Sequence, residues 1–344
     1  MRDRPVPGNS VFLLNDTSVT GHFGCIQVVE TIRRNLAMRG IALSGRWPVA
    51  VDWRFAAFHA GLRNASAFIV NGEGTIHHTR ERPKGGLLLQ FARTVKRRSD
   101  KPVFLINASF EALEPRDFDH MASFDRIFVR DRRSQAYLAE NGIASSWVPD
   151  LCLAAETQVY PRRERIVCTD SVVRPLNPLL ERHSTMLQAT FAPMRPGRRR
   201  SYWRYAFPDR AELATSFWPY YETIASARSV IAARFHAMIF CLLAGTPFVA
   251  VSSNTTKIES VLEDVFGSSS RMIPVAELAN MSRLSIPAFN RREEEQRLHY
   301  LMAARTGIAH MFDDIAAAIC ASTAATSASA STGTTPITEF RSTT

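Results

Sequence analysis

Short apolar runs alternate along most of the chain with longer segments in which apolar residues recur at helical spacing. The clearest short runs lie at residues 11–14, 65–70, 102–106, 126–129 and 146–148. Between the first two runs, residues 24–37 place their apolar side chains on one side of a helix. A regular alternation of strands and helices predicts a mostly parallel sheet with helices on both faces.

The alternation lapses around residues 154–163 and then resumes. We therefore predict an N-terminal α/β domain over residues 1–160 and a C-terminal α/β domain over residues 161–323. Two separate helices are expected at 291–304 and 308–320. The Ser-, Thr- and Ala-rich residues 324–344 are expected to form a disordered tail, because they have little to bury. No stretch is expected to span a membrane.

Residues 227–265 predict strand, helix, strand and helix in direct succession. The first of these helices is apolar nearly all round and should be buried, and Gly245 should end it with a positive φ. Arg234 and His236 lie at the first strand–helix junction, and Lys257 lies at the second. Ligands bind where the carboxyl ends of parallel strands share an edge, so these groups are expected in one cleft. They suit a small, multiply charged anion beside a helix N-terminus.

Polar side chains also follow the other predicted strands, and we expect them to line the same cleft. They are Asp16, His22, Asn71, Gly72, Glu73, Gly74, His77, Asn107, Arg130 and Asp170. Helix capping explains His22 equally well, and Asp131 is expected to be a helix cap. A turn is the alternative for Asp170. No metal site is predicted, because the histidine pair at 77–78 has no partner ligands at suitable spacing.

The formal net charge of +10 permits nucleic acid, an anionic membrane or anionic substrates as partners. No nucleic-acid-binding motif is present, so nucleic acid is not expected. The arginine-rich segment 194–204, with Tyr202 and Trp203, is either a solvated loop or a patch for lipid headgroups. The five cysteines have no paired spacing, which predicts reduced thiols and a cytoplasmic protein. If the basic segment binds lipid, the protein would lie at the inner face of the plasma membrane.

Residues 233–257, ARFHAMIFCLLAGTPFVAVSSNTTK, resemble the signature segment of the polysaccharide pyruvyl transferase family. The family pattern is Arg-x-His, a helix of small residues, Gly-x-Pro and a later Lys. Weaker similarities lie at 15–32, 68–78 and 129–150. The family more usually has three glycines at the turn where this chain has Glu73. A carboxylate there repels an anion, and it favours contact with a hydroxyl or a base role on a sugar.

This resemblance implies two Rossmann-like domains in a glycosyltransferase-B-like arrangement, with the acceptor on the N-terminal side and the donor on the C-terminal side. It also implies transfer of the enolpyruvyl group of phosphoenolpyruvate, without a cofactor, to a sugar of a bacterial polysaccharide or its lipid-linked precursor. Arg234, Lys257 and Arg130 would bind the donor, and His236 would move a proton. A packed, structural histidine is the alternative for His236.

Two other functions fit the same residues. A nucleotide-sugar-dependent glycosyltransferase could use Arg234 and Lys257 to bind a diphosphate. A non-catalytic protein could bind an anionic glycan at the membrane. The sequence alone does not identify the acceptor sugar.

Overall fold

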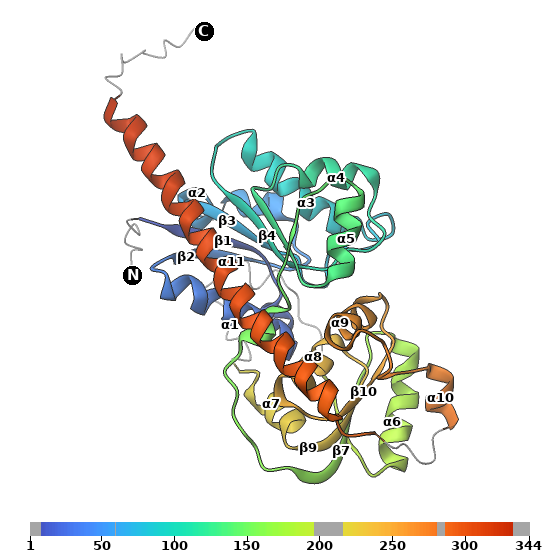
Figure 1. Cartoon of the computed structure of the whole chain (residues 1–344). Helices are drawn as coiled ribbons and strands as arrows, with labels where there is room; N and C mark the ends of the chain where they lie inside the picture. The colour runs from blue at the N-terminus through green and yellow to red at the C-terminus, as the bar shows by residue number, and fades with distance from the viewer. Residues whose placement is uncertain (1–7, 59, 196–215, 281–285, 333–344) are drawn as a thin grey trace.

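The computed structural model describes residues 8–58, 60–195, 216–280 and 286–332. They form two domains, each built around one parallel sheet, with the N-terminal domain above the C-terminal domain in Figure 1. The predicted segment 194–204 falls outside the described residues except for Met194 and Arg195.

The N-terminal sheet has the strand order β2-β1-β3-β4-β5-β6, and all its pairs are parallel. Its strands are β1 (Ser10–Asp16), β2 (Ala42–Pro48), β3 (Ala67–Asn71), β4 (Val103–Ala108), β5 (Arg126–Val129) and β6 (Ser146–Trp147). Its helices are η1 (Ser18–Thr20), α1 (Phe23–Met38), η2 (Trp53–Phe58), α2 (Ala60–Asn64), α3 (Pro83–Lys96), α4 (Pro115–Met121), α5 (Arg132–Glu140) and η3 (Leu151–Ala154).

Alternate residues of β1 explain how both faces of this sheet are covered. Val11 and Leu13 belong to one apolar cluster with the buried side of α1, whereas Phe12 and Leu14 belong to another with α3. Successive side chains of a strand point to opposite faces, so a run that is apolar throughout needs helices on both.

The C-terminal sheet has the order β11-β10-β9-β7-β8 and is also parallel. Its strands are β7 (Arg163–Thr169), β8 (Thr190–Ala192), β9 (Ala227–Ala232), β10 (Phe248–Val251) and β11 (Met272–Ile273). Its helices are η4 (Arg174–Leu176), α6 (Asn177–Met186), α7 (Trp218–Ala225), α8 (Phe235–Ala244), α9 (Lys257–Phe266) and α10 (Val275–Asn280), followed by the long α11 (Arg291–Thr332).

The central stretch forms as predicted. Helix α8 is buried along its length up to Leu243, and Gly245 ends it with a φ of 66°. Elsewhere the prediction was incomplete. Strands β2 and β8 were missed, because β2 is a half-exposed edge strand and β8 is a short one. Turns and bends occupy the residues between Thr75 and α3, which begins at Pro83.

Helix α11 corrects two further expectations. It is one continuous helix from Arg291 to Thr332, where two helices and then a tail were predicted. Residues 333–344 of the predicted tail lie outside the described part of the chain. By length and composition, residues Arg291–Ala325 would also suffice to cross a membrane, which the sequence did not lead us to expect.

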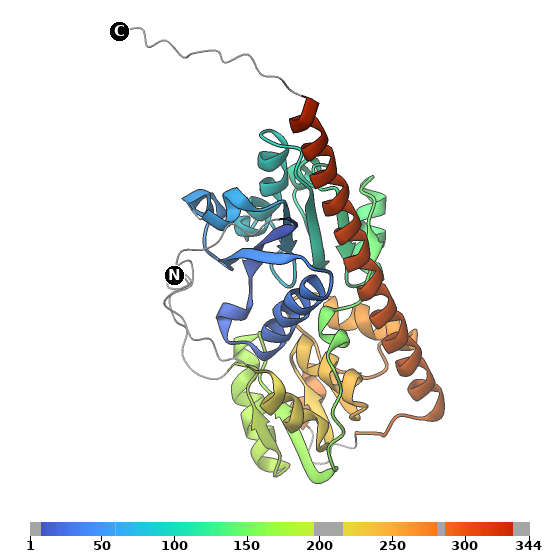
Figure 2. The same ribbon diagram turned by 90° about the vertical axis from the view of Figure 1, so that its left-hand side faces the viewer.

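Most of the large apolar side chains of α11 are nevertheless buried against the rest of the protein, although Leu298 and Met302 are exposed. The helix runs from the C-terminal domain along the N-terminal one (Figure 2), where it contacts α1 and η3. Its buried residues are Tyr300, Leu301, Ala304, Ile308, Met311, Phe312, Ile315 and Ile319. Ion pairs of Arg39 with Asp313 at 2.7 Å and of Arg126 with Asp314 at 3.1 Å attach it to the N-terminal domain. The helix therefore ties the two domains together.

Polar contacts also join the domains beside the cleft. The backbone N–H and the hydroxyl of Thr256, the N-cap of α9, both donate to Glu111 of the N-terminal domain at 2.9 Å. The backbone N–H of Arg132 donates to Asp264, and burial raises the pKa of that carboxyl to about 6. These contacts hold the start of α9, and with it Lys257, against the other domain.

Truncation of α11 tests its role as a tie. Ending the chain after Asp314 removes Ile315 and Ile319, both fully buried, and should lower the free energy of unfolding by about 1.5–3 kcal/mol for each isoleucine. Ending it after Thr323 keeps Tyr300 to Ile319, the apolar residues of the helix known to be buried, and should leave the melting temperature nearly unchanged. Denaturant unfolding of both proteins makes the comparison, and equal losses from both truncations would show that the tail contributes to stability.

Candidate active site

A cavity of about 170 Å³ lies where the carboxyl edges of the two sheets face each other. Seven of the residues predicted for the cleft line it: His22, Glu73, Gly74, Arg130, Arg234, His236 and Lys257. They come from the ends of β3, β5 and β9 and from the starts of α1, α8 and α9. Parallel strands place these ends on one edge, which is why residues so far apart in the sequence meet.

His236 lies in the first turn of α8 and reaches across to the N-terminal domain. Its Nε2 atom is 3.6 Å from an oxygen of Asp150 and 3.8 Å from an oxygen of Glu73. Among the described residues, this buried Nε2 has no hydrogen-bond partner. The ring of His22 meets it edge-on, with centroids 5.2 Å apart. An imidazole nitrogen held between two carboxylates, with its hydrogen-bonding capacity unused, is available to a ligand.

Gly24 makes this position of His236 possible. A Cβ atom at residue 24 would lie 2.1 Å from Cγ of His236, so the first turn of α1 can approach the imidazole only without a side chain there. His22, just before this turn, is the N-cap of α1 and accepts a hydrogen bond from the backbone N–H of Cys25 at 3.4 Å. His22 is therefore both a helix cap and part of the cavity wall.

Arg130 and Asp150 form a fully buried ion pair beneath His236, with a distance of 3.0 Å. The guanidinium also donates to the hydroxyl of Ser109 and lies over the ring of Phe235 at 4.1 Å. Burial alone would raise the pKa of Asp150, but His236 and Arg130 outweigh that effect and hold it well below its usual range. Arg130 is thus largely neutralised, and it is less free to bind a donor than the sequence suggested.

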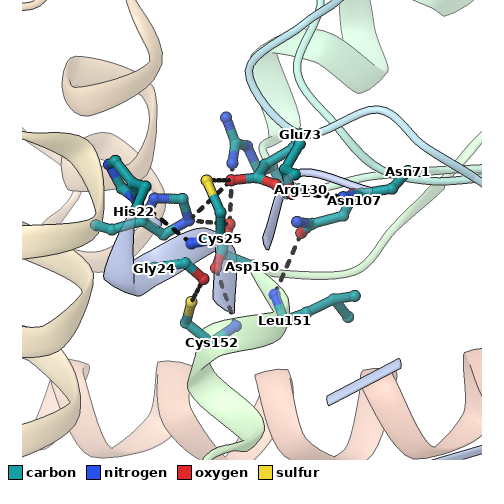
Figure 3. A network of polar contacts seen from close by, with 12 residues as sticks. His22, Gly24, Cys25, Asn71, Glu73, Asn107, Arg130, Asp150, Leu151 and Cys152 are labelled. Carbon is teal, nitrogen blue, oxygen red and sulfur yellow. Dashed lines mark hydrogen bonds and ion pairs between the residues drawn. The ribbon is translucent and has the colours of Figure 1, made fainter. Parts of the chain in front are cut away.

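Glu73 is held by several donors at the end of β3 (Figure 3). One carboxylate oxygen accepts from the hydroxyl of Thr17 and from the amide of Asn71 at 3.2 Å, and the other accepts from the thiol of Cys25 at 2.8 Å. Burial and the Glu73 charge together raise the pKa of Cys25 well above its ordinary value, so the thiol stays a donor.

The backbone conformation of residue 73 is one that favours glycine, the residue expected at this position from the family resemblance. The φ of Glu73 is 31°, in the left-handed region that glycine adopts without strain. A Cβ on Gly72 would lie 2.4 Å from Cβ of Ala108, so close approach requires glycine at that position as well. In this chain, side-chain hydrogen bonds hold a glutamate in the strained central position.

The cations of the cavity come mainly from the C-terminal domain. Burial, with Arg130 and Arg234 nearby, lowers the pKa of Lys257 to about 8. Arg234 is ion-paired with Asp170, which also accepts from the backbone N–H of Met194. Arg195 completes the group. Among the described atoms, Nε of Arg234 is buried without a partner, which leaves a donor for a ligand.

Six predicted residues do not line this cavity. Asp16 binds Ser18 and pairs with Arg46, and burial raises its pKa. Asn107 accepts from the backbone of Leu151 at 3.2 Å. Both are structural residues of the surrounding turns. Asn71 and Asp170 act indirectly, by holding Glu73 and Arg234.

The other two are Gly72 and His77. Gly72 provides the close packing described above. His77 is bound to Arg82 and lines a small void next to the cavity, and burial lowers its pKa to about 3.

The sequence analysis missed eight residues of the cavity wall. They are Thr17, Thr20, Cys25, Thr75, Val172, Arg195, Phe235 and Ser253. Several of them follow the ends of strands, and this position was the one sequence feature that could have indicated a place in the cavity wall. Hydroxyl groups and single thiols are, however, too common in turns to be singled out.

One group of possible metal ligands is present among the described residues. Asp150, Cys152 and His236 bring their ligand atoms within 4.8 Å of one another. A cation there would meet the guanidinium of Arg130, and burial raises the pKa of Cys152 well above its ordinary value, which disfavours a thiolate. These residues do not fit a metal ion, and the lack of a metal site remains a prediction.

Comparison with known proteins identifies the family. The family model for polysaccharide pyruvyl transferase matches residues 27–255. No curated protein sequence matches significantly. Because the match covers more than half of the chain, this protein belongs to the polysaccharide pyruvyl transferase family and is a transferase. The predicted membership is confirmed, and it makes a polysaccharide the general class of acceptor.

Solved structures support the fold. A putative UDP-N-acetylglucosamine 2-epimerase from Listeria monocytogenes is 9% identical, with a TM-score of 0.52 over 88% of this chain and 94% of its own. AviGT4, a glycosyltransferase involved in avilamycin A biosynthesis, is 13% identical, with a TM-score of 0.48 over 91% and 98%. The UDP-GlcNAc 2-epimerase from Methanocaldococcus jannaschii is 10% identical, with a TM-score of 0.45 over 86% and 99%. The predicted two-domain, glycosyltransferase-B-like arrangement is confirmed.

Removal of Asp150 tests the buried ion pair. Asp150→Ala leaves the guanidinium of Arg130 buried without its counter-charge, which should cost about 3–5 kcal/mol of stability. Asp314→Ala is the control, because Asp314 pairs with Arg126 at 3.1 Å in a half-exposed ion pair, and its loss should cost at most about 1 kcal/mol. Denaturant unfolding measures both, and equal losses would contradict a special role for the ion pair.

Proposed function

We propose that the cavity binds phosphoenolpyruvate and that the protein transfers its enolpyruvyl group to a sugar of a bacterial polysaccharide or its lipid-linked precursor. Family membership supports the pyruvyl transfer. Phosphoenolpyruvate is proposed as the donor because Arg195, Arg234 and Lys257 line one cavity of about 170 Å³. Phosphoenolpyruvate bears a phosphate and a carboxylate on a small skeleton, and such a ligand needs several cations in a small volume.

His236 is proposed to protonate the methylene carbon of the donor. Its Nε2 makes no hydrogen bond within the described part of the chain, and the carboxylates of Asp150 and Glu73 would provide counter-charges for an imidazolium in this buried place. Protonation turns the methylene into a methyl group and leaves an oxocarbenium-like centre at the adjacent carbon. This assigns general acid catalysis to His236.

Glu73 is proposed to receive the proton of the first sugar hydroxyl as that hydroxyl adds to this carbon. A second hydroxyl of the same sugar then displaces the phosphate and closes the ketal. Two carbon–oxygen bonds form and one breaks. Of the two hydroxyl protons released, one balances the proton gained by the methyl group and the other leaves with phosphate or solvent. The residues in the site require no cofactor for this sequence.

The proposed location is the cytoplasm, at the inner face of the plasma membrane. All five cysteines are free, as expected in a reducing compartment. Support for the membrane side is the basic, aromatic composition of residues 194–204.

Substitutions should separate proton transfer from donor binding. His236→Ala should lower turnover by about a hundredfold to ten-thousandfold while phosphoenolpyruvate still raises the melting temperature. Arg234→Ala and Lys257→Ala should lose that thermal shift, because they remove charges that hold the donor. Mass spectrometry of the pyruvylated product measures turnover, and circular dichroism confirms folding.

The control for these variants is His310→Ala, an exposed histidine of α11 outside the cavity. Normal turnover in His236→Ala would make His236 a packed, structural residue. A wild-type thermal shift with a nucleotide sugar and none with phosphoenolpyruvate would replace the pyruvyl donor with a glycosyl donor.

Donor affinity should fall above pH 8. Lys257, with a pKa of about 8 in the free protein, holds an anion only when protonated, so each further pH unit should weaken binding by up to about tenfold. A phosphate monoester has its second pKa near 6, so the donor keeps its charge across this range. His22 and His77 have lowered pKa values and Cys25 a raised one, which places their titrations elsewhere.

Calorimetric titrations with phosphoenolpyruvate between pH 7 and 9.5 measure this dependence. Lys257→Arg stays protonated throughout and should bind with little change over the range. A wild-type protein with constant affinity, or a Lys257→Arg variant with the same decline, would assign the effect to another group.

A further inference from the structure

A second and larger cavity, of about 720 Å³, opens beside the first on the N-terminal domain. One wall is the segment that follows β2, residues 49–53, and the other is the start of α3, residues 81–88. Its volume lies within the range of ordinary ligand sites, whereas the first cavity is smaller than that range. None of the residues in these two segments was singled out in the sequence.

The two cavities share part of their lining. Gly74 and Thr75 border both, and Glu73 on the neighbouring position faces the smaller one. Gly74 has no side chain to separate them, and a Cβ there would meet only Nζ of Lys257, at 3.9 Å. Thr75 is held by the amide of Asn15 at 2.9 Å. A molecule in the larger cavity would therefore reach the smaller one past Gly74, next to the carboxylate of Glu73.

The larger cavity contains an indole in a fixed orientation. The ring N–H of Trp53 donates to the backbone carbonyl of Leu87 at 2.7 Å, and the ring meets that of Phe91 edge-on, with centroids 5.3 Å apart. Trp53 itself remains partly exposed and borders the cavity. A rigid aromatic surface of this kind loses little conformational entropy when a ligand covers it.

The charges around the indole are mixed in sign, which argues against a strongly anionic ligand. Asp52 lies on one wall, and Glu81, Arg82 and Lys84 lie on the other. Asp52 already binds Arg54, and Lys84 donates to the backbone carbonyl of Ala50 at 3.0 Å. A pyranose combines an apolar C–H face with hydroxyls that both donate and accept, so an aromatic surface edged by carboxylates and amines matches it.

We infer that the larger cavity binds an uncharged pyranose of the acceptor against Trp53 and directs its reacting hydroxyls past Gly74 to Glu73. This inference rests on the proposed function for the identity of the reaction, although the sugar site itself does not depend on the donor. The volume also leaves room for a second sugar ring of the acceptor.

Sugar binding can be measured without knowing the natural acceptor. The probes are the p-nitrophenyl pyranosides of glucose, galactose, mannose and N-acetylglucosamine, observed by saturation-transfer NMR and titrated on the full-length protein. At least one should bind the wild type. Trp53→Ala should weaken that binding by about tenfold or more, and Trp53→Phe should restore part of it.

Two further variants keep the test decisive if Trp53→Ala does not fold. Glu81→Ala combined with Lys84→Ala removes two exposed charges of the cavity wall and should weaken binding severalfold. Arg93→Ala is the matched control, because Arg93 is an exposed basic residue of the same helix outside the cavity, and it should bind as the wild type does. The thermal shift with phosphoenolpyruvate should stay unchanged in all of these proteins.

Two results would overturn the inference. Either no pyranoside binds the wild type, or binding is the same in the wild type, Trp53→Ala and the double variant. Failure of the proposed donor looks different. In that case phosphoenolpyruvate gives no thermal shift to the wild type, while pyranoside binding still depends on Trp53, and the sugar site stands.

Discussion

The buried ion pair of Arg130 and Asp150 is the interaction around which the rest of the site is arranged. Arg130 follows β5 and Asp150 follows β6, so both lie at the carboxyl edge of the N-terminal sheet. Their neighbours Phe235 and His236, however, come from α8 of the other domain. Two charges with almost no exposure cost much desolvation energy, which their attraction returns only with good geometry and further hydrogen bonds. Ser109 supplies one of those bonds, and Nε2 of His236 lies 3.6 Å from Asp150.

This arrangement also divides the charges of the cleft. The negative groups, Asp150 and Glu73, lie on the N-terminal side, and the available cations, Arg234 and Lys257, lie on the C-terminal side. The proposed function uses this separation: the donor anion would bind at the start of α8 and α9, and the sugar hydroxyl would approach the carboxylate of Glu73. The lowered pKa of Lys257 reflects its burial and the nearby charges of Arg130 and Arg234, which outweigh the opposing effect of Glu73.

The geometry of the cavity depends on how the two domains are placed relative to each other, because His236 must reach the two carboxylates of the other domain. Three features hold the domains in place: the long helix α11, the contact of Glu111 with the N-terminus of α9, and the packing of α8 against η3. The larger cavity, by contrast, is built within the N-terminal domain alone. Substitutions in the larger cavity can therefore leave the contacts between the domains intact.

Local patterns in the sequence determined the strands and helices that carry the site, as well as the placement of Arg234, His236 and Lys257 at neighbouring strand ends. These features depend on apolar periodicity, on a glycine at the end of α8 and on the rule that parallel strands share an edge. They also predicted that Asp131 caps a helix and left capping as one of two equal alternatives for His22; both residues accept from a backbone N–H three positions later.

Only the tertiary structure decided which polar group meets which. Asp150 pairs with Arg130, Asp170 pairs with Arg234, and Trp53 faces the start of α3, because strand order and the approach of two domains bring these segments together. A single sequence carries no local signal for such long-range pairings. Glu73 illustrates both. Its position after β3 was evident from the sequence. Its left-handed backbone, and the three hydrogen-bond donors that hold its side chain, became visible only in the structure, because the donors come from three separate segments.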